Sequence, residues 1–151
     1  MDFSHRIWIC GGGPNSITAM EAALKMQETS YVTAYGYEVE QLIHGPVRSA
    51  DPVHDIFICI SASGNSFERM KNFAETLRSL NSAVIEITDS KVSEEKNVVL
   101  VKKMDEDLSP LVNLIVLQLL SLSVAVARGK NPDSFRSDDP AFVRMDEMIK
   151  L

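Results

Sequence analysis

Short apolar runs alternate along the chain with longer segments in which apolar positions recur at helical spacing. The runs at residues 6–10, 55–60, 83–87 and 98–101 are apolar on both faces, which is typical of strands buried in a parallel sheet. The helical spacing predicts helices over residues 16–30, 67–80 and 108–127, with Ser16 as a candidate cap of the first. This alternation predicts one α/β domain, residues 1–151, around a parallel sheet of four to five strands.

The segments between these elements are shorter and more polar. Residues 31–37 are expected to be extended, residues 38–43 to form a short helix, and residues 88–97 to be a solvated connection. From about residue 133 we expect an irregular tail, with a short helix near Met145.

The segment 110–127 is apolar apart from two amides and two serines: Asn113, Gln118, Ser121 and Ser123. A membrane-spanning helix needs about 20 mostly apolar residues. This segment is slightly shorter and carries amides, which favours a buried core or interface helix over a membrane span.

Composition and charge argue against several classes of protein. Asp and Glu outnumber Lys and Arg by 21 to 15, so the net charge of −6 lacks the basic surplus typical of nucleic-acid binding. Cys10 and Cys59 lie inside predicted strands and are expected to be reduced core residues of a cytoplasmic protein. Residues 1–6 lack the features of a signal peptide. The Cys and His spacing predicts no metal site.

Two loops follow predicted strands, where parallel sheets bind ligands. In the first, residues 11–15, Ser16 stands where a dinucleotide motif has its third glycine, which favours a simple tight turn. The second loop precedes a helix that begins at Phe67 and offers hydroxyls and amides for a phosphate monoester; its residues are Ser61, Ser63, Gly64, Asn65 and Ser66. The alternative is a serine-rich helix cap.

Charged residues on the first helix form a second candidate. Glu21, Lys25 and Glu28 share one face at spacings of four and three residues. They form either a solvated ion-pair stripe or a carboxylate base, Glu28, tuned by Lys25 and lying close to the ligand side of the sheet. His44, which precedes Gly45, is a further candidate, with a turn-capping role as the alternative.

Together these segments resemble the SIS (sugar isomerase) phosphosugar-binding family, and in particular the second isomerase half of glucosamine-6-phosphate synthases. Residues 21–31 are similar to the family's E-x-A-L-K-x-x-E-x-S-Y helix, and residues 42–46 to its L-K-H-G-P segment. Residues 61–66 resemble the S-x-S-G-x-T/S phosphate loop, and residues 117–120 and 129–133 resemble the closing helix and tail.

The resemblance implies a five-stranded flavodoxin-like sandwich that binds a hexose 6-phosphate or an amino-sugar 6-phosphate without a cofactor. It assigns the phosphate to the serines of residues 61–66. Glu28 would move a proton between C1 and C2, Lys25 would support it, and His44 would help to open the ring. Gly12 and Gly13 stand where the family has hydroxyl residues at the sugar site, and the family's C-terminal lysine falls near Pro140.

In the two-domain relatives the phosphate loop and the base helix belong to different halves, whereas this chain carries both. We therefore expect a homodimer, with the apolar face of Leu111–Val126 as a candidate interface. The expected function is that of a phosphosugar isomerase-type enzyme without a glutaminase domain. The alternatives are a non-catalytic sugar-phosphate-binding module, or one half of a split two-domain enzyme, including an amino-sugar phosphate deaminase or deglycase.

Overall fold

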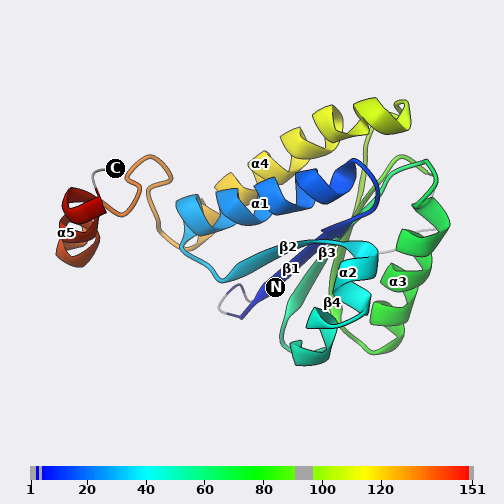
Figure 1. Cartoon of the computed structure of the whole chain (residues 1–151), viewed down its shortest axis with the longest axis horizontal. Helices are drawn as coiled ribbons and strands as arrows, with labels where there is room; N and C mark the ends of the chain where they lie inside the picture. Colours follow the sequence, from blue (N-terminus) through cyan, green and yellow to red (C-terminus); the bar gives the residue numbers. More distant parts are fainter. Residues whose placement is uncertain (1–2, 4, 91–96, 150–151) are drawn as a thin grey trace.

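Five parallel strands form a single sheet in the order β2-β1-β3-β4-β5 (Figure 1). The computed structural model describes residues 3, 5–90 and 97–149 of the 151-residue chain. The strands are β1 (Ile7–Gly11), β2 (Ala34–Glu38), β3 (Ile56–Ser61), β4 (Ala83–Thr88) and β5 (Val98–Leu100).

The strand order reverses between β1 and β3, and this point determines where a ligand site is expected. In the register of the sheet, Gly11 at the end of β1 pairs with Glu38 of β2 and Ile60 of β3. The loops after these three strands therefore leave the sheet on the same side, at the carboxyl ends of the strands. A crevice at such a reversal is the usual ligand site of open α/β sheets.

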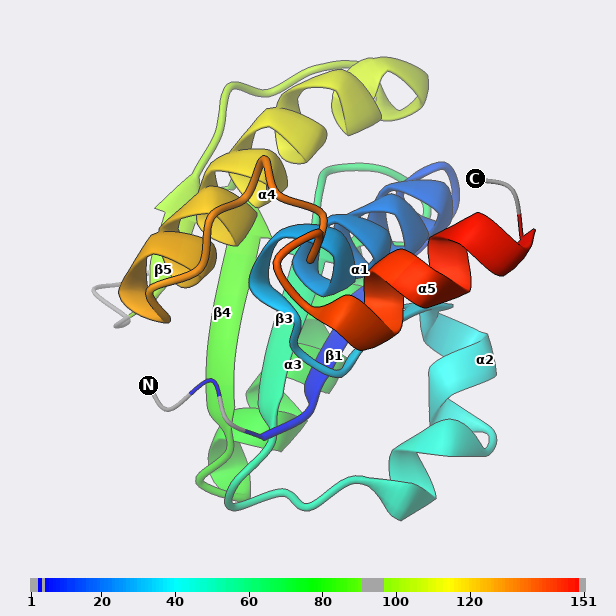
Figure 2. The same ribbon diagram turned by 90° about the vertical axis from the view of Figure 1, so that its left-hand side faces the viewer.

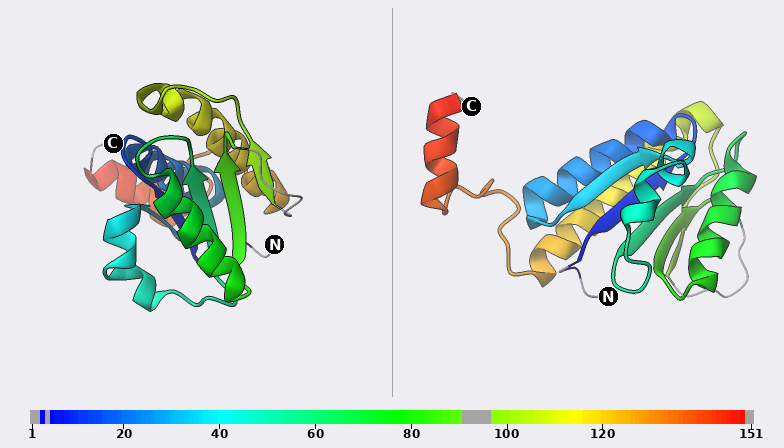
Figure 3. Two further views of the ribbon diagram at one scale, coloured as in Figure 1. Left: turned by 90° about the vertical axis from the view of Figure 1, so that its right-hand side faces the viewer. Right: turned by 60° about the horizontal axis from the view of Figure 1, so that its bottom comes forward.

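Helices cover both faces of the sheet (Figures 1 and 2). α1 (Asn15–Ser30) and α4 (Ser109–Ala127) lie side by side on one face, and α2 (Val39–Ile43) and α3 (Phe67–Ser79) lie on the other. Two short 3₁₀ turns, η1 (Pro46–Ser49) and η2 (Glu106–Leu108), complete this body. α5 (Pro140–Ile149) stands off the end of the α1–α4 layer (Figures 1 and 3).

Side chains that alternate along each strand pack into two separate hydrophobic cores, one on each face of the sheet. Ile7 and Ile9 point to the side of α1 and α4, whereas Trp8 and Cys10 point to the side of α3. Cys10 pairs in register with Cys59, and their Sγ atoms are 3.8 Å apart. Both are buried free thiols, as predicted, and the contact with Cys59 together with burial raises the pKa of Cys10 well above its usual value.

A buried carboxylate anchors the start of β1. Asp55 is only 2% exposed and accepts a hydrogen bond of 2.8 Å from the indole Nε1 of Trp8. It also pairs with the Arg6 guanidinium at 3.0 Å and accepts the backbone N–H of Asp51. Burial by itself raises the pKa of Asp55, but these three donors outweigh it and hold the pKa below its usual value.

The predicted elements are confirmed, with one difference at the start of the first helix. Ser16 lies inside the first turn of α1 rather than at its N-cap, which is Pro14, because the helix begins two residues earlier than the apolar spacing indicates. The short helix predicted near Met145 in the tail is the ten-residue helix α5. Of the predicted connection 88–97, residues 91–96 lie outside the described residues.

Candidate functional site

The loops after β1 and β3 meet at the point where the strand order reverses. A Cβ atom at Gly12 would collide with the Cβ and Oγ of Ser66, so the glycine leaves the space that the serine side chain fills. Gly64, in the same loop as Ser66, has a φ of +153°, a conformation that L side chains rarely adopt. Gly12, Gly13, Gly64, Asn65 and Ser66, all predicted from the sequence, are thus brought together.

The backbone amides of the predicted phosphate loop donate to carboxylates of this chain. The Ser63 N–H donates to Asp89 Oδ1 at 2.9 Å, and the Ser63 hydroxyl donates to the same oxygen at 2.7 Å. The Asn65 N–H donates to Glu106 Oε1 at 3.0 Å. Two positions at which the loop would hold a phosphate are therefore occupied by acidic side chains.

Ser61 differs from the other serines of the loop. It is the last residue of β3 and has no exposed surface, and its Oγ has no hydrogen-bond partner among the described residues. Its burial follows from its place in a central strand. In this structure Ser61 is thus part of the buried edge of the sheet beneath the loop.

A hollow of about 410 Å³ opens beside the loop, between the ends of β1 and β2 and the η2 turn. Among the described residues, four carboxylates line it against one guanidinium, Arg69; the carboxylates belong to Glu38, Glu40, Glu106 and Asp107. Arg69 is already held by both oxygens of Glu40, which raises the pKa of the arginine and lowers that of the glutamate. The hollow therefore has an excess of negative charge.

A buried polar network fixes the η2 turn above the loop. The Ser109 hydroxyl donates to the carbonyl of Glu106 at 2.7 Å and accepts from Asn15 Nδ2 at 2.8 Å. Asn113 Nδ2 donates to Asn15 Oδ1 at 2.9 Å, so α4 is tied to the start of α1. Ser109, Asn15 and Asn113 are all buried. These three side chains therefore hold the turn that carries Glu106 in place.

The acidic residues of this site are not among those predicted from the sequence. Asp89 directly follows β4, and its place at the carboxyl end of a strand, like that of the loops after β1 and β3, is a signal that could have identified it. Glu106 gives no such signal, because it lies 41 residues after Asn65 and reaches the loop only through the packing of α4.

Glu28 and Lys25 form a second cluster, away from the loop. Lys25 Nζ lies 2.7 Å from Glu28 Oε2 and 3.6 Å from Glu21 Oε1, which confirms that the three residues share one face. The hydrogen bond with Glu28 raises the pKa of Lys25 above its usual value. This cluster is near the C-terminal end of α1, whereas the loop lies at the N-terminal end of this helix.

The expectation that Glu28 lies close to the ligand side of the sheet is therefore wrong. At a rise of about 1.5 Å per residue, Glu28 is roughly 20 Å along the helix axis from Asn15. α1 leaves the sheet at the carboxyl edge of β1 and runs back toward the opposite edge, as a crossover helix between parallel strands must. The spacing of residues along the sequence shows which of them share a face of the helix. It does not show whether a given end of the helix lies at the carboxyl or the amino ends of the strands.

His44 lies on the other face of the sheet from Glu28. It ends α2, where its backbone N–H donates to the Glu40 carbonyl at 3.0 Å and its Nε2 lies 3.4 Å from Glu40 Oε2. Its side chain is 75% exposed. Within one chain, the sheet separates His44 from Glu28.

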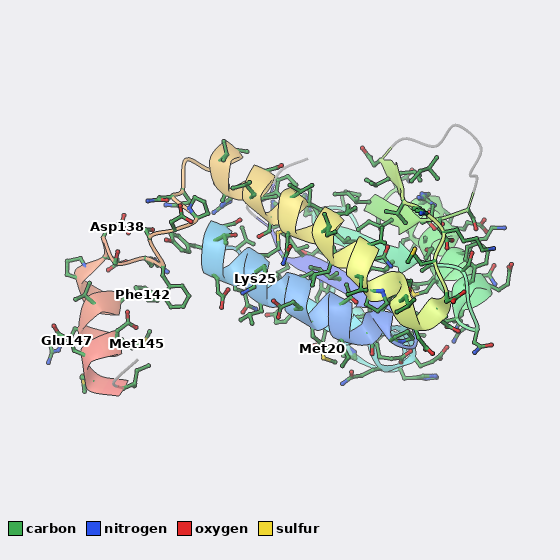
Figure 4. The ribbon with its side chains drawn as sticks, turned by 90° about the horizontal axis from the view of Figure 1, so that it is seen from above. Met20, Lys25, Asp138, Phe142, Met145 and Glu147 are labelled. Atoms are coloured by element: carbon green, nitrogen blue, oxygen red, sulfur yellow. The ribbon has the colours of Figure 1, made fainter. Side chains whose placement is uncertain are left out.

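The tail and α1 border an open cavity next to Glu28. The Tyr31 hydroxyl accepts the Arg136 backbone N–H at 2.7 Å and lies 2.8 Å from the Ser134 hydroxyl, while the Arg136 guanidinium lies over Phe142. Phe142 and Met145 lie on the side of α5 that faces α1, with Glu147 on the opposite side (Figure 4). The cavity, about 260 Å³, is lined by these tail residues and by Leu24, Gln27 and Glu28 of α1.

The outer side of the α1–α4 layer is apolar and exposed. On α4 the exposed residues recur at helical spacing: Leu111, Ile115, Leu119, Leu122 and Val126. On α1 they are Ile17, Met20 and Leu24, and Glu28 continues the same stripe. Residues 106–127 are long and apolar enough to span a membrane by length and composition, although the core helix of a soluble protein can have the same length and composition. We call this surface the α1–α4 face.

A metal centre is not indicated in the part of the chain that the structure describes. Within residues 3, 5–90 and 97–149, no group of three or more His, Cys, Asp or Glu side chains could hold a metal ion.

A parallel sheet in this order, with a serine- and glycine-rich loop where the order reverses, defines a flavodoxin-like α/β domain with a candidate anion site. More particularly, the chain belongs to the SIS domain family, whose model matches residues 3–128. The family and the fold class expected from the sequence are both confirmed.

The relatives of the chain include glutamine–fructose-6-phosphate aminotransferases (isomerizing). Over 129 residues the chain is 36% identical to the glutamine–fructose-6-phosphate aminotransferase (isomerizing) of Thermococcus kodakarensis, a match that covers 84% of this chain and 21% of that protein. The chain thus spans about a fifth of the length of this relative.

Solved structures show the same fold. The C-terminal domain of glucosamine-fructose-6-phosphate aminotransferase from Francisella tularensis superposes with a TM-score of 0.75 at 23% identity, covering 85% of this chain and 37% of that one. A glucosamine-6-phosphate deaminase from Thermotoga maritima gives a TM-score of 0.64 at 23% identity, again over 85% of this chain and 37% of that one.

Proposed function

We propose that this SIS domain is an isomerase-type enzyme that acts on a hexose 6-phosphate or an amino-sugar 6-phosphate. Glu28 carries a proton between C1 and C2 of the opened sugar, Lys25 supports its carboxylate, and His44 assists in ring opening. The loop of residues 61–66 binds the phosphate and so orients the reacting carbons. The observation that carries the proposal is the place of Glu28, half-buried at the rim of a cavity and held by Lys25 at 2.7 Å.

Each complete site then requires two copies of the chain. Glu28 is roughly 20 Å along α1 from the end where the loop lies, a distance longer than a hexose phosphate. A two-fold dimer that places the α1 helices antiparallel brings Glu28 of one copy toward the loop of the other, and forms two equivalent sites. The α1–α4 face supports this arrangement, because Glu28 lies at the end of its apolar stripe.

Proton exchange tests the proposal directly. Fructose 6-phosphate or glucosamine 6-phosphate is incubated with the protein in heavy water, and deuterium at C1 and C2 is followed by NMR. We expect exchange with the wild-type protein and a loss of about 10²- to 10⁴-fold in a Glu28→Gln variant, the range typical of a general base.

Glu21→Gln is the matched control, since Glu21 also contacts Lys25 and lies seven residues before Glu28 on the same helix face. It is expected to retain exchange within about threefold of the wild-type rate, because an exposed ion pair contributes little. Equal losses in the two variants, or no exchange with either sugar phosphate, would contradict the proposed catalytic role.

The second candidate is a sugar-phosphate-binding module without catalysis. It is supported by the roughly 20 Å along α1 that separates Glu28 from the loop within one chain. It predicts that hexose 6-phosphates raise the melting temperature while no deuterium enters the sugar. The same exchange experiment therefore distinguishes the two candidates.

A further inference from the structure

The Glu106 carboxylate lies against the backbone of both loops at the sheet reversal. Its Oε1 accepts the Asn65 N–H at 3.0 Å, and a Cβ atom added to Gly64 would collide with the carboxylate. A Cβ atom at Gly13 would lie 3.3 Å from the same oxygen. Glu106 thus approaches the chain where only glycine permits such close contact.

This position has the properties of a phosphate site. The loop leads into α3, whose first turn follows at Phe67, and the N-terminal end of a helix of this length favours negative charge. An oxygen of a phosphate group placed at the Asn65 amide would need the space that Glu106 Oε1 fills. Both groups present oxygen acceptors that carry negative charge, so the carboxylate satisfies the same donor.

We propose that Glu106 is an internal competitor for the phosphate of the substrate. Its carboxylate mimics the anion at the Asn65 amide, and a sugar phosphate binds by displacing it. This inference rests on the proposed function, because it assumes that the loop of residues 61–66 is the phosphate site.

The structure allows this displacement without unfolding the turn. The backbone of η2 is held by the Ser109 hydroxyl, which donates to the Glu106 carbonyl and not to its carboxylate. The side chain is half-exposed and borders the open hollow of about 410 Å³. Rotation about its own bonds therefore moves the carboxylate away from the loop toward solvent while the turn stays fixed.

Neighbouring charge favours departure of the carboxylate once another anion binds. Glu38 and Glu40 line the same hollow, and Arg69 is held by Glu40. With a phosphate at the loop, Glu106 would have like charges on both sides and is expected to turn toward solvent. Binding of phosphate is thus weakened by the loss of an existing hydrogen bond and by repulsion from this carboxylate.

Removal of the competing charge tests the inference. Affinity for fructose 6-phosphate, and separately for inorganic phosphate, is measured by calorimetry at constant ionic strength for the wild type, Glu106→Gln and Glu106→Ala. We expect both variants to bind about tenfold more tightly or better, because a hydrogen bond to a charged acceptor no longer has to be broken.

Asp107→Asn is the matched control, since it removes the same charge from the next residue of the turn. It is expected to change affinity by less than about threefold, as for an exposed charge. Equal affinity of the wild type and both Glu106 variants would overturn the competitor while leaving the phosphate site intact. An equal gain in Asp107→Asn would also overturn it, because the effect would then be one of general charge.

A second readout does not depend on a sugar. The Asn65 amide resonance in a ¹⁵N-labelled protein is expected to shift in Glu106→Ala and to shift again when inorganic phosphate is added. If none of the proteins binds phosphate or the sugar phosphate, the phosphate site and the competitor are both overturned. Binding to every variant with an unchanged Asn65 resonance would overturn the competitor alone.

Discussion

Gly12 lies directly against Ser66, so that the loops after β1 and β3 share one small space at the reversal of the sheet. A Cβ atom at Gly12 would collide with both the Cβ and the Oγ of the serine. Neither loop can therefore be changed without moving the other. This contact connects the stability of the sheet edge with the geometry of the candidate phosphate loop.

The Gly12→Ala substitution is expected to displace the loop of residues 61–66. Overpacking of this kind costs about 1–3 kcal/mol of unfolding free energy, which for a chain of this size corresponds to a fall in melting temperature of about 2–12 °C. Binding of fructose 6-phosphate is expected to weaken at the same time. Gly45→Ala is the control, because no atom of the described residues, chain neighbours apart, lies within 4 Å of a Cβ atom there. A Gly12→Ala protein as stable as the Gly45→Ala protein would contradict the prediction.

The Asp55 carboxylate predicts a pH-dependent contribution to stability. Its pKa in the folded chain is below its usual value, so its contribution is present above the unfolded pKa of about 3.9 and is lost as the pH falls through the folded pKa. Asp55→Asn is expected to lower the unfolding free energy at pH 7 by about 1–3 kcal/mol, because Trp8 and Arg6 lose a charged acceptor.

Urea denaturation of both proteins between pH 2 and pH 7 measures this contribution. The difference between the wild type and Asp55→Asn should shrink toward the acid end. A difference that stays constant over this range would show that the charge of Asp55 does not contribute, and that the substitution acts through packing alone.

The α1–α4 face predicts self-association through an apolar surface. Leu119→Glu places a charge at the centre of this face, where the leucine is 58% exposed, and is expected to convert a dimer into a monomer. Leu80→Glu is the matched control, since Leu80 is 54% exposed but lies beyond the end of α3 on the other face of the sheet. Light scattering coupled to size exclusion gives both masses, and a wild-type protein that is monomeric at micromolar concentration would disprove the dimer.

The tail is expected to depend on one hydroxyl group. Tyr31→Phe removes the acceptor of the Arg136 N–H and the partner of Ser134, at a cost of about 0.5–1.5 kcal/mol. Hydrogen exchange in the peptide that contains Arg136 should become faster, because its amide loses its partner. Tyr35→Phe, on edge strand β2, serves as the control and should leave this peptide unchanged. Equal exchange rates in the wild type and Tyr31→Phe would show that other contacts hold the tail.

Much of the fold could be predicted because its signals are local. Runs apolar on both faces identify β1 and β3, and the helical spacing from Phe67 identifies α3 within one residue. Glycine-containing segments mark the ends of β1 and β3, and the structure confirms that a loop follows each of these strands. The shared face of Glu21, Lys25 and Glu28 follows from helix periodicity alone, and the structure confirms it.

The candidate site could be predicted only in its parts. Its residues come from segments far apart in the chain, and their spacing along the sequence does not say which edge or face of the sheet each one reaches. Glu28 was expected beside the ligand edge and lies near the far end of α1, while the sheet separates it from His44. Glu106, which contacts the loop, has no local pattern that distinguishes it from any other exposed acidic residue.

The elements, their order and the chemistry available to them can therefore be predicted from the chain alone, because hydrophobic periodicity and turn residues act over a few neighbouring positions. Which of those groups meet depends on how the elements pack against one another. The reversal of strand order brings Gly12 to Ser66, and the packing of α4 on α1 brings Glu106 to Asn65. Such contacts depend on the crossing of whole elements in space, which no short stretch of sequence specifies.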